Sequence, residues 1–216
     1  MAFNNIKTSL NLRPEEIENE SFRIIDSESG EHGWPSVEWQ IVRRAIHTSA
    51  DFEYLQSMIF SENAVEKGIE ALKQGVGIVT DTNMALSGIS KPRLKNFGCV
   101  ISCHVADPDV IERAKSEGIT RSIAAMRKAI ADSDNRIFVI GNAPTALFEL
   151  LRNIESGVAR PALIIGIPVG FVGAEESKNA LASDTHDIPF ITNIGRKGGS
   201  NVAAAVVNAL TILAAS

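Results

Sequence analysis

The chain has 216 residues, of which 44% are hydrophobic and 22% are charged, and its formal net charge is −5 at pH 7. This composition is typical of a globular chain with enough apolar material for a core, and it excludes a disordered, collagen-like or disulfide-stapled protein. The acidic balance argues against general nucleic-acid binding, which needs a basic surface to neutralise phosphates. A local basic cluster could still hold a small anionic ligand.

Neither a targeting segment nor a membrane span is expected. The first thirty residues carry several glutamates, among them Glu15 and Glu16, and no apolar run, which argues against a signal or transit peptide. The longest apolar stretches, residues 161–172 and the alanine-rich C-terminus, are too short or too interrupted to cross a bilayer.

Cys99 and Cys103 suit buried thiols in a reducing compartment, so we expect a cytoplasmic protein.

Five short runs rich in β-branched residues predict buried strands in the second part of the chain. Strands that are buried on both faces of a parallel sheet are continuous apolar runs, and right-handed crossovers place helices on both faces. The sequence therefore predicts a three-layer α/β domain with a mainly parallel five-stranded sheet. The predicted strands cover residues 75–82, 97–105, 136–141, 161–169 and 189–195.

Capping and helix-breaking residues set the ends of the helices predicted between these strands. Asp107 and Pro108 begin one helix, which Gly118 ends. Thr120 caps a second helix that runs to about residue 131. Further helices begin at Pro144, at Ala174 and at Ser200, the first of them ending at Gly157.

The N-terminal third, residues 1–74, is interpreted as a mainly helical extension. A polar segment leads to Gly33, and Trp34-Pro35 then opens a helix whose apolar residues extend to Ile46. A further helix is predicted over residues 64–72. No linker or repeat separates this part from an α/β core over residues 75–216, so we expect a single domain that spans residues 1–216.

Polar and glycine-rich residues directly follow the predicted strands, where ligands bind in open parallel sheets. Residues 195–200, Gly-Arg-Lys-Gly-Gly-Ser, combine three glycines, two cations and a hydroxyl before a helix, which suits an anion cradle. They match neither the Walker nor the dinucleotide pattern, and a tight turn with incidental charges explains them equally well. The other strand-end positions hold Asp81-Thr82-Asn83, His104 with Asp107, residues 141–145 and residues 170–173.

Three side chains are candidates for chemistry or binding. His47 falls near the C-terminal end of its helix, where the dipole favours an imidazolium that could act as a general acid; a capping role is the plainer explanation. His104 lies near both cysteines, but the strand alternation and the spacing do not match a zinc site, so no metal site is predicted. Arg121 begins a helix and could pair with a carboxylate, although a solvated arginine is the simpler interpretation.

Three long motifs carry a family resemblance. They are GNAPTALF at residues 141–148, GIPVGFVGAEESK at residues 166–178 and GRKGGS at residues 195–200. Together with Ile46-His47, residues 81–84 and residues 120–122, they resemble the precorrin-8X methylmutases of cobalamin biosynthesis over nearly the whole chain.

The resemblance implies a flavodoxin-like fold, a tetrapyrrole substrate, a homodimer with active sites near the subunit interface, and no cofactor. The family's reaction moves a methyl group from C-11 to C-12 of the macrocycle and forms hydrogenobyrinic acid or its cobalt counterpart, cobyrinic acid. The histidine regarded as the acid in this reaction corresponds to His47. Residues 81–84 are similar to the branch that handles a cobalt-loaded intermediate, because the other branch commonly has an arginine at the position of Asn83. Cobalt, where present, would be part of the substrate.

The acetate and propionate arms of such a substrate imply the binding residues. Arg121 and Arg196 are expected to pair with carboxylates, while Met84, Phe171 and Val172 would cover the faces of the macrocycle. The complete expected binding set is Thr82, Met84, Arg121, Ser122, Asn142, Thr145, Phe171, Val172, Gly173, Arg196, Gly198, Gly199 and Ser200.

Two other functions stay open at this point. An α/β enzyme for a nucleotide or sugar phosphate would use the possible anion cradle at residues 196–200. A carrier would bind a corrinoid and deliver it without catalysis. No nucleic-acid or membrane partner is expected in either case.

Overall fold

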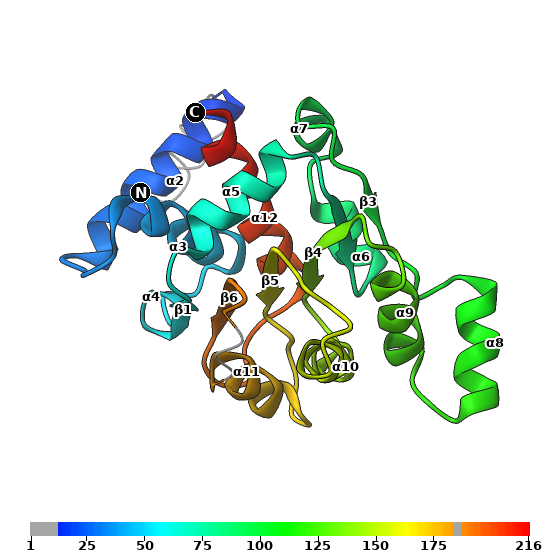
Figure 1. Cartoon of the computed structure of the whole chain (residues 1–216). Coiled ribbons are helices and arrows are strands. Elements are labelled where there is room, and N and C mark those ends of the chain that lie inside the picture. The colour runs from blue at the N-terminus through cyan, green and yellow to red at the C-terminus, as the bar shows by residue number, and fades with distance from the viewer. Residues whose placement is uncertain (1–12, 184–186) are drawn as a thin grey trace.

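The computed structural model describes residues 13–183 and 187–216, which form a twisted sheet with helices on both faces (Figure 1). The strands are β1 Met58–Phe60, β2 Gly77–Thr80, β3 Ile101–Ser102, β4 Asn135–Ile140, β5 Leu163–Gly166 and β6 Phe190–Asn193. The helices are α2 Pro14–Ser29, α3 Ser36–Ser49, α4 Tyr54–Ser57, α5 Ala64–Lys73, α6 Asn83–Gly88, α7 Lys91–Asn96, α8 Pro108–Glu117, α9 Arg121–Ile130, α10 Pro144–Glu155, α11 Ala174–Ser183 and α12 Ser200–Ala215.

The spatial order of the strands is β1-β6-β5-β4-β2-β3. The strands from β2 to β6 are parallel to their neighbours, and β1 is antiparallel to β6. Numbered along the chain, the parallel strands have the order 2-1-3-4-5, which is the flavodoxin-like order. The predicted α/β architecture is therefore confirmed, and the strand order reverses between β2 and β4.

Side chains of the central strands alternate between two cores. Ile78, Val139 and Ile165 face the layer that contains α3, α5 and α12. Val79 and Ile164 face the opposite layer, which contains α9, α10 and α11. Because both faces are buried, the strands are apolar throughout, and this explains why the sequence locates them.

Helix α8 packs on α9 through a small separate cluster. Val110 and Ala114 of α8 meet Ala124 and Ala125 of α9. Figure 1 shows α8 standing away from the sheet, with α9 between α8 and the sheet and with α3 at the other side of the molecule. The predicted ends of both helices are confirmed: Asp107 and Gly118 flank α8, and the Oγ1 atom of Thr120 accepts the N–H of Ile123 at 3.2 Å.

The sheet has one strand more than the five predicted. β1 pairs with β6, with Met58 opposite Asn193, and it comes from the N-terminal third that was predicted to be mainly helical. Its three residues give no readable alternation, and its partner strand lies near the other end of the chain. A short edge strand of this kind is defined by its partner and not by its own sequence.

Two further predictions were wrong in their boundaries. The polar segment before Gly33 contains helix α2, which is rich in charged residues and buries Phe22, Ile25 and Ser29, while Ile17 and Ile24 are exposed. The strand predicted over residues 97–105 shortens to Ile101–Ser102, and its predicted start, Phe97, is the C-cap of α7. Helices α6 and α7 were not predicted, since each has only six residues.

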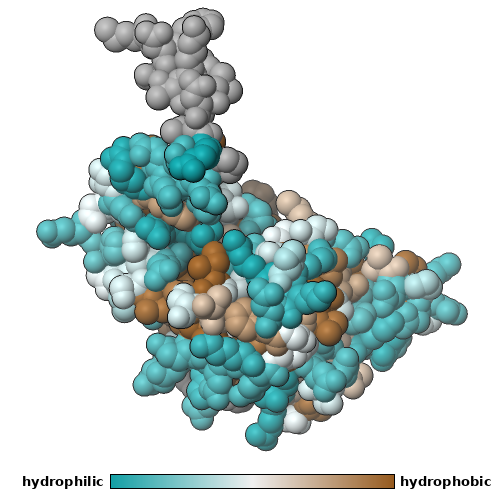
Figure 2. Space-filling view, turned by 90° about the horizontal axis from the view of Figure 1, so that it is seen from above, coloured by the Kyte–Doolittle hydropathy of each residue, from teal (hydrophilic) through white to brown (hydrophobic). Residues whose placement is uncertain are grey.

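No helix within the described residues is long and apolar enough to cross a membrane. The face seen in Figure 2 is mostly hydrophilic, with hydrophobic side chains gathered in a band across its middle.

Candidate active site

A buried carboxylate holds the point where the strand order reverses. Asp81 follows β2 and is 4% exposed. Its carboxylate oxygens accept the N–H groups of Gly141 at 3.0 Å, Asn142 at 2.9 Å and Ala143 at 2.7 Å, in the turn after β4. Burial raises the pKa of the Asp81 carboxyl, while the three N–H donors act in the opposite direction. These N–H groups are therefore bound within the protein, and Asn142 would have to contact a ligand through its exposed side chain.

The strand reversal also brings together Thr82 and Ser200, which are distant in the sequence. The Oγ1 atom of Thr82 accepts the N–H of Ala85 at 3.1 Å and lies 2.8 Å from the Oγ atom of Ser200, the first residue of α12. A Cβ atom on Gly141 would lie 2.6 Å from the Cα atom of Ser200. Thr82 and Ser200, both in the predicted binding set, are thus direct neighbours, and glycine at position 141 permits the close approach.

The loops after β5 and β6 are bonded to one another. Gly170 donates its N–H to the Arg196 carbonyl at 3.1 Å, and Gly199 donates its N–H to the Ile167 carbonyl at 3.0 Å. A Cβ atom on Gly198 would lie 2.6 Å from the Pro168 carbonyl oxygen. Two of the glycines in the predicted anion cradle therefore serve loop packing, which weakens the phosphate-binding alternative.

Lys197 joins the β6–α12 loop (residues 194–199) to the end of α3. Its Nζ atom lies 2.5 Å from Asp51 Oδ2 and 2.6 Å from Glu53 Oε2. These carboxylates raise the pKa of the Lys197 ammonium. We refer to this contact as the Lys197 bridge. It commits one of the two cradle cations to the protein itself and brings the segment after α3 to the carboxyl edge of the sheet.

His47 lies in the last turn of α3, four residues before Asp51, and its side chain is exposed. The imidazole packs against the Phe22 ring of α2, with ring centroids 5.1 Å apart. The predicted helix and the position of His47 at its C-terminal end are confirmed. Because of the Lys197 bridge, this end of α3 lies beside the β6–α12 loop.

Arg121 and Ser122 lie on the other side of the sheet, at the start of α9. The Oγ1 atom of Thr120 donates to Thr145 Oγ1 at 3.3 Å, so the first turns of α9 and α10 are neighbours. The Arg121 side chain is exposed and forms no ion pair with any residue that the structure describes. The structure thus separates the predicted set into two groups, with Arg121, Ser122 and Thr145 on the face opposite to α3.

Large apolar side chains are exposed at the same edge. Phe171 is 85% exposed, Val172 is 89% exposed and Met84 is 66% exposed. The guanidinium of Arg196 lies 5.7 Å from the centre of the Phe171 ring, and its Nε atom lies 3.9 Å from Glu175 Oε2. Exposed apolar side chains grouped with cations are typical of a binding surface for a flat anionic ligand.

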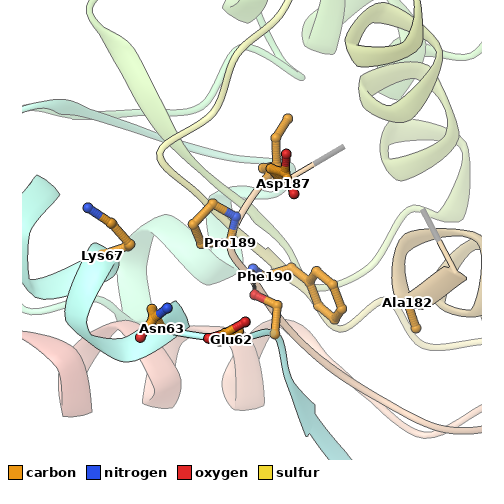
Figure 3. A pocket seen from close by; sticks show the side chains of 9 residues that line it. Glu62, Asn63, Lys67, Ala182, Asp187, Pro189 and Phe190 are labelled. Atoms are coloured by element: carbon orange, nitrogen blue, oxygen red, sulfur yellow. Dashed lines mark hydrogen bonds between the residues drawn. The ribbon is translucent and has the colours of Figure 1, made fainter. Parts of the chain in front are cut away.

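Two hollows lie at the other edge of the sheet, away from the predicted binding residues. One of about 400 Å³ includes Asn63, Lys67 and Phe190, whose ring points toward Ala182 (Figure 3). Another of about 590 Å³ lies between Gly77, Ser102 and Asn135. None of the predicted binding residues lines either hollow.

Residues outside the predicted binding set organise this edge, namely Asp81, Lys197 and Lys178. Lys178 is 1% exposed, and burial lowers its pKa to about 8. The sequence contained a signal for it, because Ala174, Lys178 and Leu181 have the spacing of one buried helix face. The sequence placed Asp81 at a strand end and Lys197 in the possible anion cradle, but it gave no signal for their contacts, because the partners are distant in the sequence.

The geometry gives no metal cluster within the described residues, where no three His, Cys, Asp or Glu side chains are grouped as ligands. His104 instead places its Nδ1 atom 2.9 Å from Asp107 Oδ2.

The topology and the loops define an α/β protein whose candidate ligand surface lies at the carboxyl ends of the strands. A family model described as precorrin-8X methylmutase matches residues 16–213. The cobalt-precorrin-8 methylmutase of Priestia megaterium is 49% identical, covering 96% of this chain and 91% of that protein. The precorrin-8X methylmutase of Pseudomonas aeruginosa is 40% identical and covers 90% of this chain and 93% of that protein. The solved precorrin-8X methyl mutase of Thermus thermophilus superposes with a TM-score of 0.86 at 45% identity, covering 92% of this chain and 95% of that one. The chain therefore belongs to the precorrin-8X methylmutase family and is an isomerase.

Replacing Asp81 by asparagine tests the anchor at the strand reversal. In Asp81→Asn one oxygen becomes an NH₂ group, so at least one of the three N–H donors loses its acceptor. We expect the free energy of unfolding to fall by about 1–3 kcal/mol, measured by denaturant titration. Asp109→Asn, which alters a surface ion pair with Lys128, is the control and should change stability little. An unchanged Asp81→Asn stability would contradict the anchoring role.

Proposed function

We propose that this chain catalyses the [1,5]-sigmatropic transfer of a methyl group from C-11 to C-12 of precorrin-8X or cobalt-precorrin-8, with His47 as the general acid. The products are hydrogenobyrinic acid and cobyrinic acid, respectively. Membership of the methylmutase family over residues 16–213 is the observation that carries the proposal. The exposure of His47 beside the β6–α12 loop supports its role as the acid.

The reaction sets a limited task for the protein. The bond from C-11 to the methyl carbon breaks while the bond from C-12 forms, and the product is an isomer, so no electrons are gained or lost. The protein must hold the macrocycle and withdraw electron density from its π-system as the methyl group moves. An imidazolium that donates a hydrogen bond to a ring nitrogen does this and recovers its proton afterwards; a placed acid contributes on the order of 10²- to 10⁴-fold.

The carboxyl edge offers groups suited to such a substrate. Phe171, Val172 and Met84 present apolar surface for the flat macrocycle, and Arg196 and Arg121 present cations for its carboxylate arms. Asn142, Thr145, Ser122 and Ser200, the first residue of α12, add neutral hydrogen-bonding groups. The β6–α12 loop, with Gly198 and Gly199, closes against the loop that carries Gly173. The proposal requires no cofactor, and cobalt would enter as part of the substrate. The sequence of residues 81–84 and the 49% identity to the Priestia methylmutase favour the cobalt-loaded substrate.

We also propose a homodimer in which two chains complete each site. His47 belongs to the layer of α3, and Arg121 belongs to the layer of α9 on the opposite face of the sheet. Apolar side chains, among them Phe171 and Val172, are exposed on the surface at the carboxyl edge. A second copy that covers this surface would exclude water from the macrocycle and could supply Arg121 to the site that contains His47.

Removing the His47 imidazole tests the acid. His47→Ala should still bind the corrinoid product, because binding relies on other groups, but its turnover should fall roughly 10²- to 10⁴-fold. The visible absorption change on corrin formation measures turnover. His32→Ala is the matched control, since His32 stacks on Trp39 near the other end of α3. Wild-type turnover in His47→Ala would remove the acid role, and product binding by the native chain without any isomerisation would favour the carrier function.

Mixing two impaired variants tests the shared site. If His47 and Arg121 in each site come from different chains, co-refolded His47→Ala and Arg121→Ala chains form some mixed dimers with one intact site. We expect the mixture to recover activity that neither variant has alone, while His47→Ala mixed with itself recovers none. Absence of recovery in verified mixed dimers would contradict the sharing of the site.

A further inference from the structure

Lys178 is a buried cation whose place in the fold is not explained by core packing. It lies on α11 with 1% of its surface exposed, and it forms no salt bridge with a carboxylate among the described residues. Its Nζ atom donates to the Lys197 carbonyl at 2.5 Å and to Asn193 Oδ1 at 3.3 Å. Because an apolar side chain would fill this position without the cost of burying a charge, the ammonium is expected to serve its acceptors.

The Lys197 carbonyl is held from two sides. Asn193, itself 1% exposed at the end of β6, donates through Nδ2 to the Lys197 carbonyl at 3.0 Å and to the Ile194 carbonyl at 3.0 Å. Together with Lys178, it fixes the backbone of the β6–α12 loop at Lys197. The two donors come from β6 and α11, so two secondary-structure elements hold the carbonyl.

The side chain of Lys197 connects this backbone position to the segment that follows α3. Its ammonium contacts Asp51 and Glu53 in the Lys197 bridge. This segment follows Ala50, whose left-handed backbone, with a φ of 52°, ends α3. Because the helical pattern stops there, the contacts of Asp51 and Glu53 help determine where the last turn of α3, with His47, lies relative to the loop.

We propose that Lys178 is a positioning residue that acts through Lys197 to set His47 against the β6–α12 loop. The inference rests on the proposed function, in which His47 and Arg196 engage the same macrocycle. Lys178 does not touch the substrate in this arrangement. It fixes the carbonyl from which the Lys197 bridge extends.

The free energy of unfolding distinguishes a positioning role of Lys178 from a role in stability. Burial lowers the pKa of Lys178 to about 8, below the ordinary value of 10.5, so the unfolded chain binds the proton more tightly than the folded one. This group therefore lowers stability at neutral pH, and the penalty is relieved as the pH rises from about 8 to 10.5. Lys178→Met should consequently unfold at no lower denaturant concentration than the native chain at pH 7, whereas a residue kept for stability would lower it.

The experiment compares Lys178→Met, Lys197→Met and the double variant in the full chain. We expect kcat to fall roughly 10- to 100-fold in each single variant, because small misplacements of a catalytic group have effects of this size. The double variant should lose no more than the larger single loss, since both changes break one link. Lys67→Met is the matched control, because Lys67 pairs with Glu70 on α5 away from this edge, and its kcat should stay unchanged.

Amide hydrogen exchange needs no substrate, so it tests the positioning role of Lys178 separately from the proposed function. Amide hydrogen exchange at residues 50–53 should become faster in Lys178→Met and in Lys197→Met, but not in Lys67→Met. If the native chain shows no isomerisation, the proposed function fails while the exchange data still test the link. Native kcat in Lys178→Met, additive losses in the double variant or unchanged exchange would each overturn the proposal. A Lys178→Met variant that does not fold would show that Lys178 serves stability and would also overturn the proposal. Lys197→Met, whose side chain is 43% exposed, tests the outer part of the link by the same kcat and exchange criteria.

Discussion

Three backbone N–H groups converge on the carboxylate of Asp81, and the geometry of the carboxyl edge depends on that interaction. It fixes the turn after β4 against the end of β2, where the two strands connect to helices on opposite faces. Beside it, Thr82 contacts Ser200 and so places the start of α12. The loop before α12 then bonds to the loop after β5. The buried carboxyl group of Asp81 thus holds the turns to which the other loops attach.

The Lys197 bridge extends this frame to α3. A parallel sheet collects its loops at one edge, but α3 belongs to the N-terminal third and reaches that edge only through the segment that follows it. Lys178 and Asn193 fix the Lys197 carbonyl from the inside, and Asp51 and Glu53 receive its ammonium on the outside. The proposed acid and the proposed carboxylate-binding loop are in this way parts of one connected unit, while Arg121 belongs to the opposite layer.

The sequence predicted what local chemistry determines. Apolar runs located the parallel strands, and Asp107, Thr120 and Gly118 marked helix ends that the structure confirms. It missed β1, whose partner is distant, and α2, in which charged and polar residues predominate. Strand-end positions indicated Thr82 and Ser200 but not that they touch, and the contacts of Asp81 and Lys197 were not predictable because they join segments far apart in the chain. The long motifs indicated the family. The role of His47 as the general acid stays a prediction, because the contacts of His47 in the single chain do not test it.

The most direct measurement is the structure of this protein with a bound corrinoid product. The account predicts that the macrocycle lies at the carboxyl edge, with a ring nitrogen within hydrogen-bonding distance of the His47 imidazole and with Phe171 and Val172 against one of its faces. A corrinoid bound at the amino edge, in the hollow near Phe190, or placed beyond the reach of His47, would contradict it.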